Sequence, residues 1–174
     1  AGVHPATCLP VCLDVGTNNE RLLNDPNYKG LRRRRLTGEA YDALVDEFMR
    51  ELRAWQPRCL VQFEDFGNAN AFRILEKYRH TGPCFNDDIQ GTASITLAAL
   101  LSALRVTKGR LEDQRILFYG AGEAGVGIGE LIAMAMEKTG MSHKEAMERC
   151  YFMDSKGLVC KSRLDGLQPH KVAF

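Results

Sequence analysis

The sequence has no excess of charge of either sign. Its 174 residues include 23 Lys and Arg against 22 Asp and Glu, which gives a formal net charge of +1. A balanced chain of this kind gives no reason to expect a nucleic-acid partner or a membrane surface. The local exception is the run of four arginines at residues 32–35. We interpret this run as a solvated basic turn, with a phosphate or partner site as the alternative.

Paired cysteines and long apolar runs are also missing. The six cysteines show neither a C-x-x-C pair nor the spacing of zinc ligands. Several lie among apolar residues, so we expect reduced, buried thiols in an intracellular protein. The cytoplasm is the expected compartment, with mitochondrion or plastid as alternatives. No stretch approaches the ~18 apolar residues of a membrane span. No signal peptide is visible, and the first residue is not Met, so we expect part of the N-terminus to be missing.

The apolar pattern predicts helices that alternate with short strands. The expected helices cover residues 37–56, 69–82 and 92–109, and a fourth runs to residue 138. The expected strands cover residues 58–63, 84–85, 115–119 and 150–154. The third helix is apolar almost all round and is therefore expected to be buried. The last two strands and the helix between them form one βαβ unit of a parallel sheet.

A glycine-rich turn follows the strand predicted at residues 115–119. It consists of Gly120, Ala121, Gly122, Glu123, Ala124 and Gly125. Gly120 would permit the tight turn, Gly122 would let the backbone approach a pyrophosphate, and Gly125 would let the helix pack closely on the strand. The first N–H groups of the helix favour anionic phosphates. The pattern predicts dinucleotide binding, and a merely tight strand-to-helix turn is the alternative.

An acidic residue at the end of the next strand usually accepts a hydrogen bond from the ribose, ~20 residues beyond such a turn. Asp154 is the candidate, although it follows Gly125 by 29 residues. The chain then ends after two strands of a fold that needs about six. We therefore expect it to be an internal piece of a larger protein.

Two acidic pairs end the two short strands upstream of this turn. Glu64 and Asp65 follow the first strand, and Asp87 and Asp88 follow the second, all close to phenylalanines. Buried carboxylates usually become neutral, form ion pairs or coordinate a metal. Neighbouring side chains on a strand point to opposite faces, so Glu64 and Asp65 can share one ion only if the chain bends, which Gly67 makes plausible. Carboxylates without His or Cys suit Mg²⁺ or Mn²⁺. A solvated acidic loop is the equally weighted alternative.

The stretches LVQFEDFGNANAF (residues 60–72), FNDDIQGTAS (85–94) and GAGEAGVGIGELI (120–132) together resemble the malic enzyme family. The stretch CLPVCLDVGTNNERLLNDPNY, residues 8–28, resembles it as well. The resemblance extends over essentially the whole chain. It implies oxidative decarboxylation of malate to pyruvate and CO₂, with NADP or NAD as the hydride acceptor and with Mg²⁺ or Mn²⁺. It also implies a homo-oligomer, either a dimer or a tetramer.

The resemblance assigns roles residue by residue. Glu64, Asp65 and Asp88 match the metal ligands, Asp87 matches a catalytic acid beside the metal, and Asn68 matches a cofactor contact. The family's general acid Tyr, general base Lys and substrate-binding Arg have no matching motif in this chain. The isolated chain is therefore expected to be inactive.

The resemblance also favours the NADP-using branch of the family. That branch carries a Lys seventeen residues after the acid at the end of the second strand, and Lys171 stands at that position. Asp154 alone would favour NAD⁺, because its carboxylate repels a 2′-phosphate. Charge-assisted contacts from Lys171, helped by Ser155, can outweigh that repulsion.

The predicted fold class is α/β. Residues 1–86 are expected to be the C-terminal part of a substrate and metal domain. Residues 87–174 are expected to be the first βαβ unit of a Rossmann-type NAD(P)-binding domain. One rival is another nicotinamide dehydrogenase, such as an amino-acid dehydrogenase, which would leave the four acids unexplained. The other rival is a non-catalytic dinucleotide-binding module.

Overall fold

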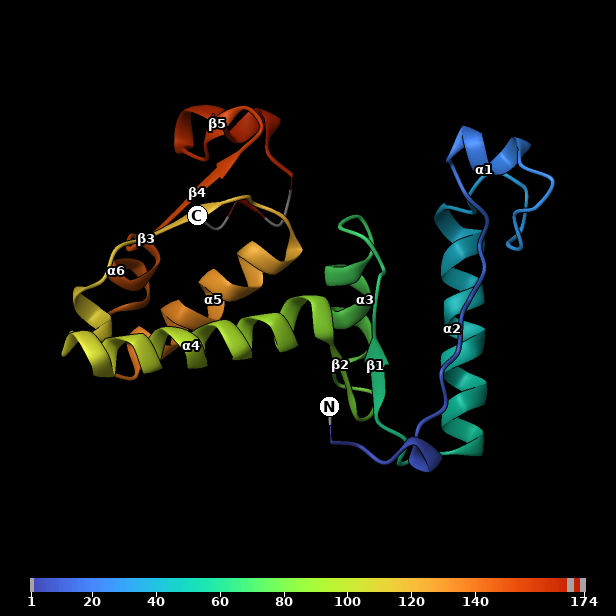
Figure 1. The fold of residues 1–174 in the computed structure, drawn as a ribbon, viewed down its shortest axis with the longest axis horizontal. Helices are drawn as coiled ribbons and strands as arrows, with labels where there is room; N and C mark the ends of the chain where they lie inside the picture. The colour runs from blue at the N-terminus through green and yellow to red at the C-terminus, as the bar shows by residue number, and fades with distance from the viewer. Residues whose placement is uncertain (1, 169–170, 173–174) are drawn as a thin grey trace. The chain divides into compact units, whose positions relative to one another are not determined.

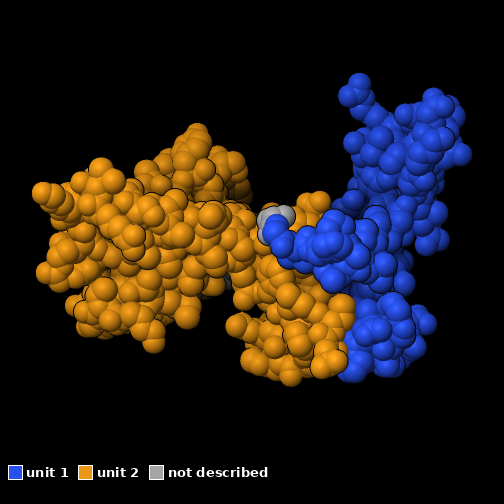
Figure 2. Space-filling model, turned by 60° about the horizontal axis from the view of Figure 1, so that its bottom comes forward, with its two compact units in different colours: residues 1–57 blue, residues 58–174 orange. Residues whose placement is uncertain are grey.

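The computed structural model describes residues 2–168, 171 and 172. Two compact units follow one another along the chain, residues 1–57 and 58–174, and Figure 2 colours them separately. Figure 1 labels the helices and strands of both units. Every residue predicted to belong to the functional site falls within residues 58–174. The domain boundary predicted between residues 86 and 87 stays a prediction.

The first unit is built on one long helix. Its elements are η1 (Pro5–Thr7), α1 (Glu20–Asn24) and α2 (Gly38–Trp55). Tyr41, Val45 and Met49 recur every four residues along α2 and are buried, as an amphipathic helix requires. The helix ends just before Pro57, whose missing N–H and ring cannot continue it. The predicted helix is confirmed, although the Thr37 side chain makes no capping hydrogen bond.

Hydrogen bonds hold the backbone around the arginine run, residues 32–35, and the arginine side chains are exposed. The N–H of Thr17 donates to the carbonyl oxygen of Arg33 at 2.9 Å, beside Gly16, whose φ of 87° is in the left-handed region. The carboxylate of Asp14 accepts the N–H groups of Gly16 and Leu31, at 2.9 and 2.6 Å. The Gly16 N–H contributes most to the lowered pKa of Asp14, and the Leu31 N–H adds to it. All four arginines are exposed, as the interpretation as a solvated turn requires.

The second unit begins with two short parallel strands. They are β1 (Val61–Phe63) and β2 (Cys84–Asn86), joined through α3 (Ala71–Tyr78). Val61 and Phe63 are buried while Gln62 faces outward, and the Phe63 ring packs edge-on against Phe66 at 5.4 Å between centroids. Because the strands are parallel, their carboxyl ends meet at one edge of the sheet. α3 ends at Tyr78, so the predicted end at Gly82 is wrong by four residues.

The helix after β2 is less buried than the sequence predicts. A π-helical turn, η2 (Asp87–Gly91), leads into α4 (Thr92–Thr107), and Lys108 ends the helix in the left-handed region at φ 55°. Only Ala93 of α4 is buried, so the prediction of an almost wholly buried helix is wrong. Leu97, Leu100 and Leu104 pack on the core, whereas other apolar side chains of the helix are exposed. An apolar pattern all round a helix shows that its whole surface can be buried, but it does not show which other elements cover that surface.

The stretch from Asp87 to Thr107 bears on the expectation that the chain has no membrane span. Within the described residues it is the one helical stretch long and apolar enough, by length and composition, to cross a membrane, with a mean hydropathy of 1.3. Only 17% of that stretch is buried. A core helix of a soluble protein meets the same criteria, so this single stretch is weak evidence for a membrane span.

The remaining elements form the βαβ unit that the sequence predicts. They are η3 (Leu111–Asp113), β3 (Ile116–Tyr119), α5 (Glu123–Glu137), α6 (His143–Met147), β4 (Cys150–Asp154), β5 (Gly157–Leu158) and η4 (Lys161–Gly166). β3 and β4 are parallel, and β5 adds a short antiparallel strand that the sequence pattern did not predict. α5 lies between α4 and the strands (Figure 1). Its buried side chains, such as Ile132 and Met136, form one core with Phe152 of β4.

The cysteine side chains are less buried than expected. The six cysteines all lie in the described part of the chain and none forms a disulfide there, but only Cys150 is buried, whereas Cys8 and Cys12 are exposed. Burial raises the pKa of the Cys150 thiol to about 11. A thiol with so high a pKa is almost entirely protonated near neutral pH and is therefore a poor nucleophile.

Candidate functional site: an acidic group beside a glycine turn

A sharp backbone bend brings Glu64 and Asp65 to the same side of the chain. Asp65 has φ 57° and Gly67 has φ 65°, both in the left-handed region. Asp is one of the few non-glycine residues that tolerate this region, and such outliers gather at functional sites. The sequence predicted a bend made possible by Gly67, and the structure places part of it at Asp65 itself. Both acids are exposed beyond the end of β1, so neither is buried among the phenylalanines.

The second acidic pair lies on the π-helical turn after β2. Asn86 precedes it and is completely buried, and its side-chain oxygen accepts the N–H of Ile89 at 3.0 Å. This hydrogen bond fixes the start of the turn. Single π-helical turns are rare in proteins. Those that occur are often found at functional sites, where they redirect side chains within a helix. Asp87 and Asp88 are the first two residues of this turn.

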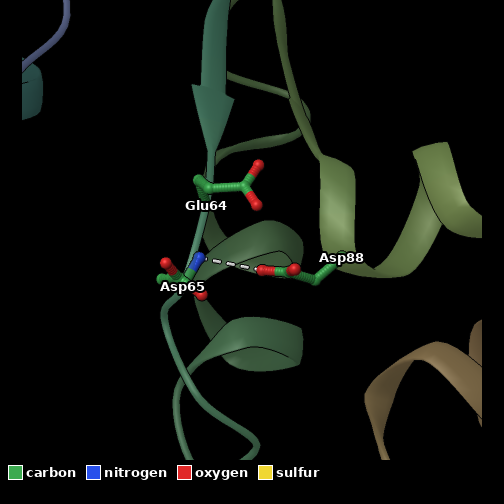
Figure 3. A group of neighbouring side chains, drawn as sticks. All are labelled: Glu64, Asp65 and Asp88. Carbon is green, nitrogen blue, oxygen red and sulfur yellow. Dashed lines mark hydrogen bonds between the residues drawn. The ribbon is translucent and has the colours of Figure 1, made fainter.

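Three of the four acids converge. One carboxylate oxygen from each of Glu64, Asp65 and Asp88 lies within 4.8 Å of the other two. The N–H of Asp65 also donates to Asp88 Oδ2 at 2.8 Å, so the two loops are tied together (Figure 3). Three hard oxygen donors at this spacing fit Mg²⁺ or Mn²⁺ after small side-chain rotations. Asp87 is not part of the group, and its carboxylate lies against Gly91 instead.

The glycine turn has the geometry that close approach of a dinucleotide requires. Gly120 has φ 135°, which disfavours any residue with a Cβ. A Cβ at Gly125 would lie 2.7 Å from the carbonyl oxygen of Gly120, so α5 can pack this close to the turn only with glycine there. Gly122 is the N-cap of α5, and it has no side chain that could accept a hydrogen bond from the first N–H groups of the helix. The residues present therefore fit a phosphate at this helix start.

Asn68 joins the acidic loop to the glycine turn. Its side-chain oxygen accepts the N–H of Glu123 at 2.9 Å, although the two residues are 55 positions apart. It thereby occupies one of the free N–H groups at the start of α5. The residue that the resemblance assigns to cofactor contact thus lies at the N–H groups where a phosphate would bind.

A cleft of about 560 Å³ contains both parts of the site. Its lining includes Asp65 and Asp88 from the acidic group, Asn68, and most of the glycine turn. Glu123 also faces this cleft, and its Oε1 atom is buried without a hydrogen-bond partner. Burial, with a smaller contribution from the charge of Asp88, raises the pKa of Glu123.

A second cleft, of about 380 Å³, extends from the glycine turn to the end of β4. Its lining includes Ala121, Asp154, Ser155 and Lys171. Arg163 donates from Nη2 to both carboxylate oxygens of Asp154, at 2.9 and 3.0 Å. Lys171 Nζ lies 3.3 Å from Asp154 Oδ2. The pKa of Asp154 is lowered to about 2, chiefly by the hydrogen bond from the Lys156 N–H and then by Arg163 and Lys171.

Three residues that matter for this geometry were not identified as site residues from the sequence. Gly91 leaves room for the Asp87 carboxylate. Gly127 lets α5 approach η2, since a Cβ there would lie 2.8 Å from both the Cγ2 atom and the carbonyl oxygen of Ile89. Arg163, in the turn after β5, holds the Asp154 carboxylate. The alternating glycines at 125, 127 and 129 were the available signal for a close helix contact.

Two pairs of parallel strands and a glycine turn at the start of α5 are typical of an α/β nucleotide-binding protein, and the three carboxylates that follow β1 and β2 could hold a divalent metal. Comparisons with known proteins agree. The malic enzyme N-terminal domain matches residues 1–79, and the malic enzyme NAD binding domain matches residues 89–174. The predicted boundary at 86/87 lies in the short stretch between the two matches.

The chain is also similar to individual malic enzymes. It is 58% identical to an NADP-dependent malic enzyme of Columba livia, over 99% of this chain and 31% of that protein. It is 56% identical to an NADP-dependent malic enzyme of Homo sapiens, over 93% of this chain and 28% of that protein. A crystal structure of Entamoeba histolytica malic enzyme superimposes with a TM-score of 0.64 at 26% identity, over 94% of this chain and 28% of that chain.

The chain belongs to the malic enzyme family. It spans about three tenths of the length of the curated relatives that it matches. The α/β fold class, with a Rossmann-type NAD-binding region after an N-terminal-domain region, is confirmed.

Proposed function

We propose that the protein containing this chain converts malate to pyruvate and CO₂ with reduction of NADP⁺, in a reaction that requires Mg²⁺ or Mn²⁺. The observation that carries the proposal is the single cleft lined by both the acidic group and the glycine turn. A dinucleotide on the turn and a metal-bound hydroxy acid would then lie next to each other. That proximity is what hydride transfer requires.

The residues of this chain would bind the divalent ion and the dinucleotide and orient them. Glu64, Asp65 and Asp88 would hold the divalent ion, and the hydrogen bond from the Asp65 N–H keeps Asp88 in place. The N–H groups at the start of α5 would bind the pyrophosphate. When bound, the metal would supply a Lewis acid that stabilises negative charge on the substrate oxygen, and the nicotinamide would accept the hydride. Asp87 would act beside the metal as a catalytic acid.

The relatives support the choice of cofactor. Their names specify NADP-dependent malic enzymes, from Columba livia to Homo sapiens, and Ser155 and Lys171 line the cleft next to Asp154. Relatives in Mus musculus and Homo sapiens are named as mitochondrial. An intracellular location follows for this protein, and the cytoplasm stays the predicted compartment. A homo-oligomer, dimeric or tetrameric, is part of the same proposal.

An assay of the full-length protein tests the proposal. We expect malate-dependent formation of NADPH and of pyruvate, abolished by EDTA and restored by Mn²⁺. Activity that survives EDTA would identify a metal-independent dehydrogenase instead. Binding of NADP⁺ without turnover of malate would identify a non-catalytic dinucleotide-binding module.

Replacement of Gly91 by alanine tests the role of Asp87. A Cβ at position 91 would overlap Asp87 Oδ1, so the carboxylate must rotate away. Gly91 has helical dihedral angles, φ −66° and ψ −49°, and alanine is favoured over glycine there by roughly 1 kcal/mol. We therefore expect kcat to fall at least about tenfold, within the range for a general acid or base, without a lower melting temperature. Steady-state kinetics and a thermal melt measure the two effects.

Gly166→Ala is the matched control, because a Cβ at Gly166 would meet no atom within 4 Å. Unchanged kcat in Gly91→Ala would mean that the position of the Asp87 carboxylate does not matter for the reaction.

A further inference from the structure

Asp154 lies where a ribose-binding acid is expected, yet its carboxylate is already bound within the chain. Three groups donate to it: the N–H of Lys156 at 2.8 Å, both contacts from Arg163, and the ammonium of Lys171 at 3.3 Å. The side chain of Asp154 is only 13% exposed. A carboxylate held this way cannot readily turn to accept a ribose 2′-hydroxyl.

Arg163 is the partner with the most fixed geometry. Its Nη2 spans both oxygens of Asp154, while its Nη1 donates to the carbonyl oxygens of Gly157 and Leu158, at 3.0 and 2.7 Å. The guanidinium is therefore anchored on the β5 segment. Arginine keeps its charge at every relevant pH and forms paired contacts with carboxylates that lysine cannot reproduce.

Two of the three side chains line the second cleft and the third does not. Asp154 and Lys171 line the second cleft, whereas Arg163 does not. One carboxylate and two cations leave the group with a net charge of +1. Without Arg163, Asp154 and Lys171 would neutralise each other, and Lys171 would be held as the counter-ion of Asp154.

We propose that Arg163 is a specificity-determining positioning residue for a dinucleotide with a phosphate on the adenosine ribose 2′-oxygen. This inference rests on the proposed function. Arg163 lies outside the cleft lining and keeps Asp154 in an ion pair. Asp154 therefore neither binds a free 2′-hydroxyl nor repels a 2′-phosphate. Lys171 is then free to exchange its contact with Asp154 for one with the phosphate. Arg163 acts through Asp154 and does not itself contact the cofactor.

The test measures the dissociation constants of NADP⁺ and NAD⁺ by calorimetry, without malate, in the full-length protein and in Arg163→Gln. We expect NADP⁺ to bind roughly tenfold more weakly in the variant, the size of one charge-assisted contact. We expect NAD⁺ to bind as well as before or more tightly, because Asp154 becomes able to accept its 2′-hydroxyl. Arg163→Lys keeps the charge and should restore part of the NADP⁺ affinity.

The double variant Asp154→Asn/Arg163→Gln shows whether Arg163 acts through Asp154. In the Asp154→Asn background, the Arg163→Gln change should alter NADP⁺ affinity less than twofold, since no carboxylate is left to be released. A full tenfold loss in that background would overturn the inference, as would parallel losses of both dinucleotides in Arg163→Gln. If the unaltered protein binds neither dinucleotide, the proposed function falls and the inference falls with it.

Discussion

Replacement of Asp88 by asparagine in the full-length protein is expected to lower the turnover of malate by at least about a hundredfold. Asparagine has the same shape and can still accept the hydrogen bond from the Asp65 N–H, now 2.8 Å from Asp88 Oδ2. The loop geometry should therefore persist while one anionic metal ligand is lost. Stabilisation of charge by a metal is worth several kcal/mol, and each 1.36 kcal/mol corresponds to about tenfold in rate.

Kinetics over a Mn²⁺ titration measure this effect. The apparent metal requirement should rise together with the loss of turnover, and Glu64→Gln should behave similarly. Asp113→Asn is a suitable control, because Asp113 is exposed and lines neither cleft. Near wild-type turnover of both site variants at low Mn²⁺ would remove Glu64 and Asp88 from the metal site.

Replacement of Lys171 by glutamine is expected to raise the apparent KM for NADP⁺ by roughly ten- to a hundredfold, as the loss of one or two charge-assisted hydrogen bonds would. The KM for NAD⁺ should change little, because NAD⁺ has no 2′-phosphate for the ammonium to bind. Lys171 lines the second cleft and its side chain is only 13% exposed, so it is not an ordinary surface lysine. Initial rates with each dinucleotide give the comparison.

Lys161→Gln serves as the control for this prediction. Lys161 is an exposed lysine of the same segment, and its replacement removes the same charge outside the cleft lining. If Lys171→Gln raises both KM values equally, or neither, Lys171 does not bind the 2′-phosphate. That result would leave the malate reaction itself untouched.

Local patterns were sufficient to predict the order of the longer elements, although not the short α6 and β5. The period of Tyr41, Val45 and Met49 predicts α2, and the glycine turn after a strand predicts the start of α5. Both signals arise from neighbours within a few residues along the chain. The strand ends that carry the acids were predicted for the same reason, because short apolar runs mark strands wherever they occur.

What depends on distant contacts could not be predicted in the same way. The π-helical turn depends on Asn86 and on the approach of Gly127 to Ile89, and no local pattern indicates either. The pairing of Asp154 with Arg163 likewise required knowing where β5 and the following turn run. The apolar residues all round α4 predicted that the helix is buried. The sequence of the helix does not indicate which other elements cover it.

The glycines of α5 also bear on attempts to make this protein more heat-resistant. Replacing glycine by alanine at compatible positions typically adds ~0.4–1 kcal/mol of stability. Gly125 and Gly127 would be natural choices by helix propensity alone, yet a Cβ at either meets main-chain oxygen at 2.7–2.8 Å. At Gly127 the gain in propensity would be opposed by displacement of the turn that carries Asp87 and Asp88, and at Gly125 by displacement of the glycine turn at Gly120.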